Sequence, residues 1–109
     1  MSIVLEKFKT RFLPEGLYEL DKAGHYSDGS WCLRLYQNGK PELTVTVSVE
    51  NNVIPDGHIL IKNWSENEGV REALFKAGVI ENVAVLIPTG FVHAHLCKLT
   101  ETARQQLGI

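Results

Sequence analysis

The residues from Ser30 to Glu50 alternate between apolar and polar on both sides of an Asn38-Gly39 pair. This pattern is typical of a hairpin with one buried face, because strand side chains alternate and Asn-Gly favours a tight turn. A two-residue loop would place Leu33 opposite Thr44 and mix the two faces. A three-residue loop, with Gly39 in the left-handed position of a bulge, keeps the faces apart. It predicts a Gln37-Asn38-Gly39 loop and the pairs Leu33–Leu43, Trp31–Val45 and Arg34–Glu42.

The rest of the chain carries further strand, turn and helix signals. Alternating or apolar runs predict strands over residues 6–13, 17–20, 58–63, 80–87 and 91–99, with turns or loops at residues 14–16, 24–29, 51–57 and 88–90. Ser65 and Glu68 match a capping box, which predicts a helix from Ser65 that ends at Gly78. Thr100 predicts the cap of a short C-terminal helix. Together these elements predict one α+β domain over residues 1–109, a mainly antiparallel sheet of hairpins packed on one central α-helix.

Composition and charge exclude several classes of protein. The chain has 109 residues, 44% of them hydrophobic, and a formal charge of −2, which fits one globular domain and gives no bulk attraction to nucleic acid. No apolar run approaches the length of a membrane span, and charged residues interrupt the first ten, so we expect no membrane partner and no signal peptide. Cys32 and Cys97 lie far apart in the sequence, which favours two free buried thiols in a cytoplasmic protein over a disulfide.

The histidines raise the question of a metal site or an enzyme. His93 and His95 lie two residues apart on a predicted strand and face the same side, with Cys97 next in line. With His58 or His25 they would offer zinc ligands, but only one pair has metal-site spacing, so we expect no metal and no cofactor. Cys97 lacks an orienting group and an oxyanion donor, and the sequence holds no nucleotide-binding or hydrolase motif. We therefore predict a protein that is not an enzyme, and a metal-dependent enzyme stays the least favoured alternative.

The densest polar run in the chain surrounds Trp64. Capping accounts for Ser65 and Glu68, but it does not require an indole flanked by amides. Trp is a typical interface anchor, so a strand-to-helix junction of this composition indicates a recognition surface. The alternative is structural, with Trp64 covering the base of the helix and its neighbours satisfying loop backbone. The sequence predicts binding through Asn63, Trp64, Glu66 and Asn67.

A second candidate surface is basic. Lys7, Lys9 and Arg11 alternate with Phe8 and Phe12 on the first predicted strand, so the cations share one face. Such a stripe contacts phosphates in nucleic-acid-binding proteins. It also protects edge strands from sheet-to-sheet aggregation. Nucleic-acid binding through these three residues is the alternative to protein binding.

Three runs follow one another in a recognisable order: the hairpin after Ser30, the run Ile61-Lys62-Asn63-Trp64-Ser65-Glu66-Asn67-Glu68-Gly69, and Pro88-Thr89-Gly90-Phe91-Val92. Over residues 30–98 the sequence resembles a family of small uncharacterised bacterial proteins found largely in phages, plasmids and other mobile elements. It departs from that family at Val47-Ser48-Val49, where a polar Asn is expected. The family supplies no catalytic residues to transfer, and the resemblance implies a small protein that acts on host machinery.

The sequence thus leads to one hypothesis with two alternatives. The first is a non-enzymatic binding protein of a mobile element or phage that contacts a host or phage protein complex, such as a defence system that it inhibits. The alternatives are a nucleic-acid-binding accessory protein and a metal-dependent enzyme that uses the two histidines. An exposed strand edge would also allow a homodimer.

Overall fold

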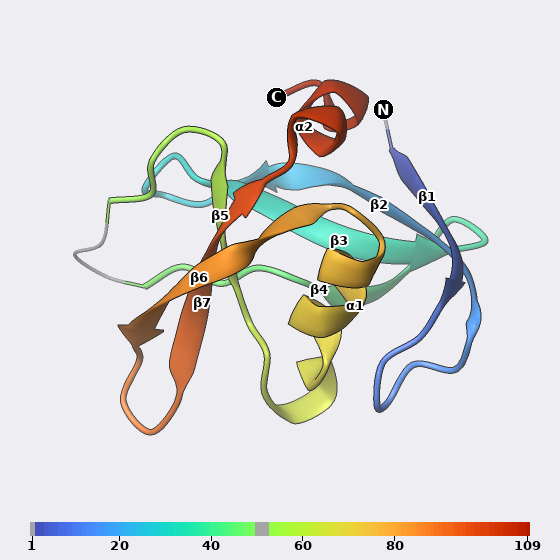
Figure 1. Ribbon diagram of the computed structural model, residues 1–109, viewed down its shortest axis with the longest axis horizontal. Coiled ribbons are helices and arrows are strands. Elements are labelled where there is room, and N and C mark those ends of the chain that lie inside the picture. The colour runs from blue at the N-terminus through green and yellow to red at the C-terminus, as the bar shows by residue number, and fades with distance from the viewer. Residues whose placement is uncertain (1, 50–52) are drawn as a thin grey trace.

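The computed structural model describes residues 2–49 and 53–109, which form two antiparallel sheets (Figure 1). The first sheet has the order β1-β2-β3-β4 and consists of β1 (Ile3–Phe8), β2 (Gly16–His25), β3 (Trp31–Gln37) and β4 (Lys40–Thr44). The second has the order β5-β7-β6 and consists of β5 (His58–Ile61), β6 (Ile80–Pro88) and β7 (His93–Leu99). The predicted strands over residues 17–20, 58–63, 80–87 and 91–99 are confirmed, although their bounds shift.

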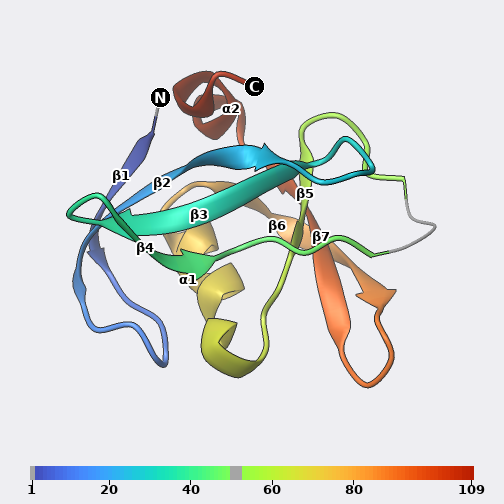
Figure 2. The same cartoon turned by 180° about the vertical axis from the view of Figure 1, so that it is seen from behind.

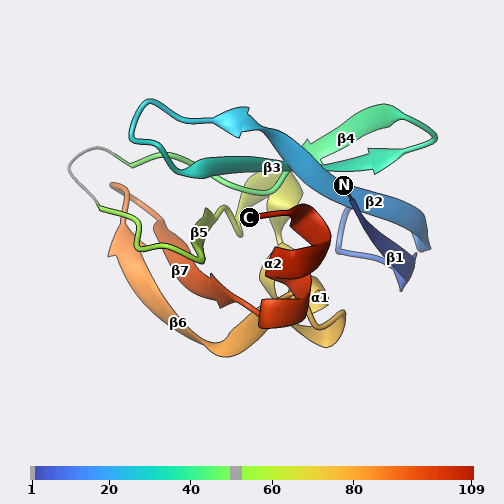
Figure 3. The same ribbon diagram turned by 90° about the horizontal axis from the view of Figure 1, so that it is seen from above.

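Short helices complete the second layer. They are the 3-10 turn η1 (Ser65–Asn67), α1 (Val70–Lys76) and α2 (Glu101–Leu107). Seen from above, the first sheet forms one layer, and α1 and α2 lie beside β6 and β7 in the other (Figure 3). The α+β class and the antiparallel pairing are confirmed. The predicted central helix corresponds to α1 and the predicted short C-terminal helix to α2, and each has seven residues.

One cluster of buried apolar side chains fills the space between the two layers. Each major element contributes to it, and the following members are at most 1% exposed: Leu20, Leu33, Leu35, Ile59, Ile61, Leu74, Leu99 and Leu107. Helices as short as α1 and α2 are unstable in water on their own. Their conformation therefore depends on the apolar faces that they bury in this shared core.

The β3–β4 hairpin turns through two residues rather than three. Asn38 and Gly39 have φ of 53° and 77°, the positive values of a type I′ turn. The ladder pairs Leu35 with Leu43 and shifts between Leu35 and Tyr36, which leaves Glu42 as the extra residue of a bulge. The predicted Gln37-Asn38-Gly39 loop and its three pairs are therefore wrong. The common apolar face is confirmed, because Leu33, Leu35, Leu43 and Val45 are all buried.

The chain leaves the first sheet directly after β4. The Val45 N–H still donates to the Leu33 carbonyl at 2.9 Å, but the Val47 N–H donates to the Leu60 carbonyl at 3.0 Å. Thr46 forms an isolated bridge with Ile61. Figure 2 shows this crossing segment as it runs from β4 past β5. The predicted strand through residue 50 is therefore divided between two sheets, and residues 50–52, with the start of the predicted loop at 51–57, lie outside the described residues.

The first strand is shorter than predicted. Lys7 has φ of 50°, and the β1–β2 ladder shifts register between Leu5 and Phe8, where β1 ends. A turn then replaces the alternating strand, because the Thr10 N–H donates to the Leu13 carbonyl at 3.2 Å and the Leu13 N–H to Thr10 Oγ1 at 3.1 Å. The predicted strand over residues 6–13 is therefore wrong in its bounds: β1 ends at Phe8, before Lys9 and Arg11.

The start of α1 differs from the predicted capping box. Ser65 has φ of 53° and belongs to η1, and the N-cap of α1 is Gly69 in the left-handed conformation. The Arg71 N–H donates instead to Asn63 Oδ1 at 2.9 Å. Asn63 therefore satisfies a free backbone donor in the first turn of the helix, a task that the prediction gave to Ser65 and Glu68. The predicted end at Gly78 is confirmed, with φ of 78°.

The predicted cap at Thr100 is confirmed, and it gives a direct test of α2. Thr100 Oγ1 accepts from the Ala103 N–H at 3.2 Å and donates to the Gly78 carbonyl at 2.7 Å. We expect Thr100→Ala to lower the free energy of unfolding by about 1 kcal/mol, because both hydrogen bonds disappear. Thr100→Ser keeps the hydroxyl and should lose much less. Chemical denaturation of the two variants measures the difference, and equal stability would contradict the cap.

Candidate functional site

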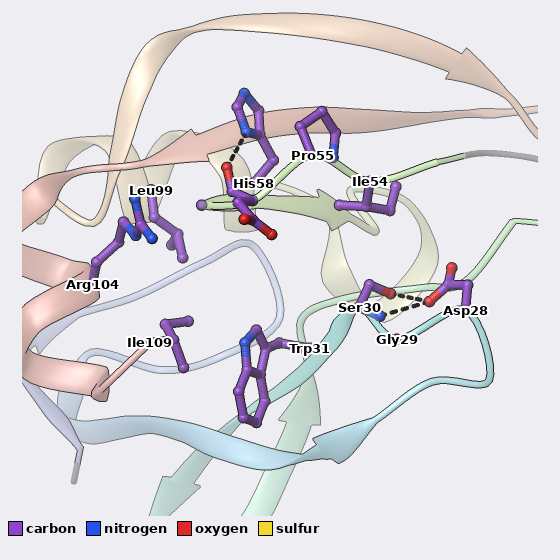
Figure 4. Close-up of a pocket in the computed structure, with 12 residues that line it drawn as sticks. Asp28, Gly29, Ser30, Trp31, Ile54, Pro55, His58, Leu99, Arg104 and Ile109 are labelled. Atoms are coloured by element: carbon purple, nitrogen blue, oxygen red, sulfur yellow. Dashed lines mark hydrogen bonds between the residues drawn. The ribbon is translucent and has the colours of Figure 1, made fainter.

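A cavity of about 500 Å³ opens between the two layers at the end where β3 and β5 begin. The β2–β3 turn, the loop before β5, the end of β7 and α2 all contribute to its wall. Figure 4 shows Arg104 and the turn with Asp28 and Ser30 on opposite sides, and Trp31 on a third side. Ile54 and Pro55 form an apolar edge opposite Trp31. The volume lies within the range of small-molecule pockets, roughly 300–1,000 Å³.

Arg104 is the main cationic group of this cavity. It projects from α2 against the backbone of Gly57, so closely that a Cβ at Gly57 would stand 3.0 Å from Arg104 Nη1. Gly57 has φ of 75° and ends a turn in which the His58 N–H donates to the Pro55 carbonyl at 3.1 Å. The predicted turn therefore places a glycine, Gly57, where the guanidinium of Arg104 packs and where a side chain would not fit.

Trp31 forms a rigid wall because its ring is held from outside the cavity. The ring centroid of His25 lies 3.7 Å from that of Trp31, and Lys22 Nζ lies 5.1 Å from the indole ring. The nitrogen edge of the indole faces the open space in Figure 4. These contacts restrict rotation of the indole, so the cavity is largely preformed on this side.

The two aspartates near the cavity differ in their surroundings. Asp28 Oδ1 accepts from the Ser30 hydroxyl at 2.5 Å and from the Ser30 N–H at 2.8 Å. These hydrogen bonds lower the pKa of Asp28, so the carboxylate is ionised at neutral pH and hydrogen-bonded to Ser30. Asp56 is exposed, and its backbone carbonyl lies 3.0 Å from His58 Nδ1. The imidazole of His58 is thereby tied to the loop.

The structure separates the four residues predicted to bind around Trp64. Asn67 is 0% exposed, and its Nδ2 donates to the Thr44 carbonyl at 2.7 Å, so its side chain joins η1 to the first sheet. Asn63 caps α1, as described above. For Asn67 the expectation of a contact surface is corrected, because its buried side chain satisfies a backbone group near the chain crossing. Asn63 is half-buried and its Oδ1 accepts from α1, so its role in a contact surface stays a prediction.

Trp64 and Glu66 remain at the surface of the same junction. Lys62 Nζ lies 2.5 Å from Glu66 Oε1 and 5.9 Å from the centroid of the Trp64 ring. The hydrogen bond from Lys62 lowers the pKa of Glu66. Trp64 is half-buried, and Glu66 is exposed. Within the predicted binding set, Glu66 is exposed and Trp64 and Asn63 are half-buried, whereas Asn67 is out of a partner's reach.

The three basic residues of the alternative surface are exposed, but they do not form one strand face. Lys7 lies in β1, whereas Lys9 and Arg11 lie in the loop after it. Arg11 Nη1 pairs with Glu68 Oε2 at 2.5 Å. All three line a groove of about 420 Å³ against α1, and the carboxylates of Glu6 and Glu72 share it. The mixed charge does not favour phosphate contact, and nucleic-acid binding stays a prediction.

The candidate metal ligands do not converge. His93 pairs with Pro88 at the start of β7, His95 pairs with Ile61, and His58 pairs with Lys98 near the other end of the sheet. Within residues 2–49 and 53–109, no group of three histidine, cysteine, aspartate or glutamate side chains is placed to hold a metal ion. His25 is stacked on Trp31 in the first sheet. His93 and His95 are thus neighbours on β7, whereas His58 and His25 lie elsewhere in the fold.

His95 is half-buried and Cys97 is fully buried, and both lie near Arg71 of α1. Burial, together with the charge of Arg71, lowers the pKa of His95, so the imidazole is neutral at pH 7. Burial raises the pKa of the Cys97 thiol, which opposes formation of a nucleophilic thiolate. Cys97 is 0% exposed. Both cysteines are free and buried, as predicted.

The most exposed large apolar side chain of the described residues, Phe91, lies on the β6–β7 hairpin and was not predicted to be exposed. We call Val85, Leu86 and Phe91 the hairpin surface; their exposed fractions are 56%, 56% and 108%. The Thr89 N–H donates to the Val92 carbonyl at 2.9 Å, so Phe91 lies in the turn and not at the start of a strand. An aromatic residue directly after Thr89-Gly90 was the available signal. The sequence pattern instead predicted Phe91 as the first residue of a strand over residues 91–99.

Two further findings bear on the class of protein. Across the described part of the chain, no helix is long and apolar enough to cross a membrane. No family model, curated protein or solved structure matches the sequence or the fold. The resemblance over residues 30–98 therefore stays a prediction.

Proposed function

We propose that the protein is a small non-enzymatic binding protein of a mobile element or phage, which contacts a host protein complex in the cytoplasm and inhibits it. The observation that carries protein binding is the hairpin surface, where three large apolar side chains are exposed on one ribbon. Exposed apolar groups of this size mark protein-interaction sites when they are contiguous. The resemblance to mobile-element proteins supports a host complex as the partner, and two free thiols fit a reducing compartment.

The backbone of β6 supports the same proposal. β6 is the last strand of its sheet and, among the described residues, pairs only with β7. Residues 82–87 read Asn-Val-Ala-Val-Leu-Ile and contain no charge and no proline, the devices that usually protect an edge strand. An extended apolar segment of a partner can add to such an edge through main-chain hydrogen bonds, with Phe91 as a side-chain anchor.

A different protein fits this surface better than a second copy of the chain. Antiparallel pairing of β6 with its own copy would direct the two Phe91 turns toward opposite ends of the joint sheet. Each aromatic side chain would then lie far from the two-fold axis. One partner that covers both the β6 edge and the turn can contact Phe91 together with Val85 or Leu86, which project to opposite faces of β6. Trp64 follows β5, and the last residue of β5, Ile61, pairs with His95 a few residues after the turn with Phe91. A partner bound at that turn can therefore also contact Trp64.

We expect Phe91→Ser and Leu86→Ser to weaken capture of the partner about tenfold or more, because truncation of a buried interface anchor removes most of its binding energy. The measurement compares proteins retained from host lysate by wild type and variants, followed by calorimetry with the purified partner. Phe12→Ser is the matched control, since Phe12 is 57% exposed on a different loop. Trp64→Ala tests whether the junction contributes.

Two results would overturn the proposal. One is a set of retained proteins that does not change between wild type and the two hairpin variants, with thermal unfolding unaltered. The other is self-association in analytical ultracentrifugation that Leu86→Ser abolishes, which would assign the hairpin surface to a second copy of the chain. Partner binding that survives Phe12→Ser and fails with Phe91→Ser supports the proposal.

A further inference from the structure

We propose that the cavity beside Arg104 is a binding site for a small organic oxyanion, a carboxylate or phosphate carried on an apolar body. This proposal is independent of the protein partner, because the cavity lies at the beginning of β3 and β5 and shares no residue with the hairpin surface. Its basis is a set of hydrogen-bond donors that face the cavity while acceptors for them are absent from the described residues.

The first donor is the guanidinium of Arg104. Its Nε is shielded from solvent and has no hydrogen-bond partner in the described part of the chain. No salt bridge to Arg104 is formed by residues 2–49 or 53–109 either. Shielded polar atoms are nearly always satisfied in folded proteins. An arginine cannot escape this requirement by losing its proton, so the charge of Arg104 is left uncompensated by the part of the chain that the structure describes.

The position of Arg104 is set before any ligand arrives. The guanidinium lies against the backbone of Gly57, where a Cβ would approach Nη1 to 3.0 Å. The Gly57 carbonyl in turn accepts from the Leu99 N–H at 2.8 Å, which ties this loop to the end of β7. A planar guanidinium fixed in this way presents its remaining N–H groups in the fork that carboxylates and phosphates match.

The other walls select the rest of the ligand. The indole N–H of Trp31 is a donor without an acceptor among the described residues, and its edge faces the cavity (Figure 4). Ile54, Pro55 and Ile109 add apolar surface. Asp28 lines the cavity, but its carboxylate accepts two hydrogen bonds from Ser30, which partly compensate its charge. Asp56 is exposed and has no cationic partner within residues 2–49 and 53–109, so it disfavours ligands with several negative charges. A singly or doubly charged anion with a small ring or aliphatic body fits these groups.

The test uses benzoate, phenyl phosphate and inorganic phosphate as probes, with benzylamine as the cationic control. Nitrogen–proton NMR spectra follow the Trp31 indole and the Gly57 amide, which distinguishes Trp31 from Trp64. We expect benzoate or phenyl phosphate to shift both signals with a Kd below about 1 mM. The tighter of the two identifies the oxyanion, and weaker binding of inorganic phosphate than of phenyl phosphate shows that the apolar wall contributes.

Arginine variants provide the decisive comparison. Arg104→Gln should weaken binding of the better probe about tenfold or more, since charge-assisted hydrogen bonds are lost. Arg11→Gln is the matched control and should change it less than about twofold, because Arg11 lies on another surface. Trp31→Phe keeps an aromatic side chain but removes the indole N–H donor. We expect it to weaken binding of the better probe, as followed through the NMR signal of the Gly57 amide. Absence of saturable shifts up to about 10 mM, equal binding of benzylamine, or an unchanged affinity in Arg104→Gln would overturn the proposal.

Discussion

Leu74→Ala is expected to lower the free energy of unfolding by about 3 kcal/mol, within the range of roughly 2–5 kcal/mol for deleting a buried leucine side chain. Leu74 is 0% exposed and, with Val70, is one of the two buried residues of α1. A helix of seven residues has little stability of its own, so its attachment depends on these two side chains. Loss of one of them leaves a void in the shared core and loosens the helix that covers β6 and β7.

The neighbouring residue supplies the control. Phe75 is larger than Leu74 but is 42% exposed, and we expect Phe75→Ala to cost less than about 1 kcal/mol. Urea denaturation at constant pH measures both variants, and the change in midpoint at constant slope gives the difference. Equal losses in the two variants would show that α1 does not attach to the core through Leu74.

The second large effect is expected from Asn67→Asp, which we predict to cost about 3 kcal/mol at pH 7. The substitution preserves the shape of the side chain but replaces the amide donor that reaches the Thr44 carbonyl at 2.7 Å. A carboxylate oxygen and a carbonyl oxygen repel each other at this distance, and the site is 0% exposed. The variant therefore tests whether Asn67 is a structural residue or part of a contact surface.

The pH dependence of Asn67→Asp has a definite sign. Burial opposite a carbonyl raises the pKa of the introduced carboxyl in the folded state above its unfolded value of about 3.9. The protonated acid can donate to Thr44, so the destabilisation is small below that pH and grows as the pH rises. Glu66→Gln, one residue away and exposed, is expected to change stability by less than about 0.5 kcal/mol. A destabilisation independent of pH would contradict the proposed hydrogen bond.

Sequence patterns succeeded where a feature depends on neighbours in the chain. The alternation around Asn38-Gly39 identified the buried face of the hairpin, because a strand has only two faces and a one-residue shift would expose the core. Thr100 and Gly78 were identified as helix ends because capping involves residues within one turn. The buried face of the hairpin and these two helix ends were therefore predicted correctly from interactions between residues close in the sequence.

The register of the same hairpin was wrong for a long-range reason. Both loops satisfy the face rule, one with a bulge in the turn and the other with a bulge at Glu42. The second occurs together with the crossing that brings Thr46 opposite Ile61 in the other sheet. Similarly, Asn63 caps α1 because the end of β5 lies beside the first turn of the helix. Ser65 and Glu68 match the local motif but adopt another geometry.

The sequence alone determined the class of the fold and its main strands, because alternation, turn residues and caps act over a few positions. Only the tertiary structure decided which polar groups are internal and which surfaces are exposed. Asn67 became a core residue and Phe91 an exposed one, and residues 31, 57 and 104 came together around one cavity. No local pattern encodes these outcomes, because each depends on how two sheets close over a common core and on which backbone groups that closure leaves without partners.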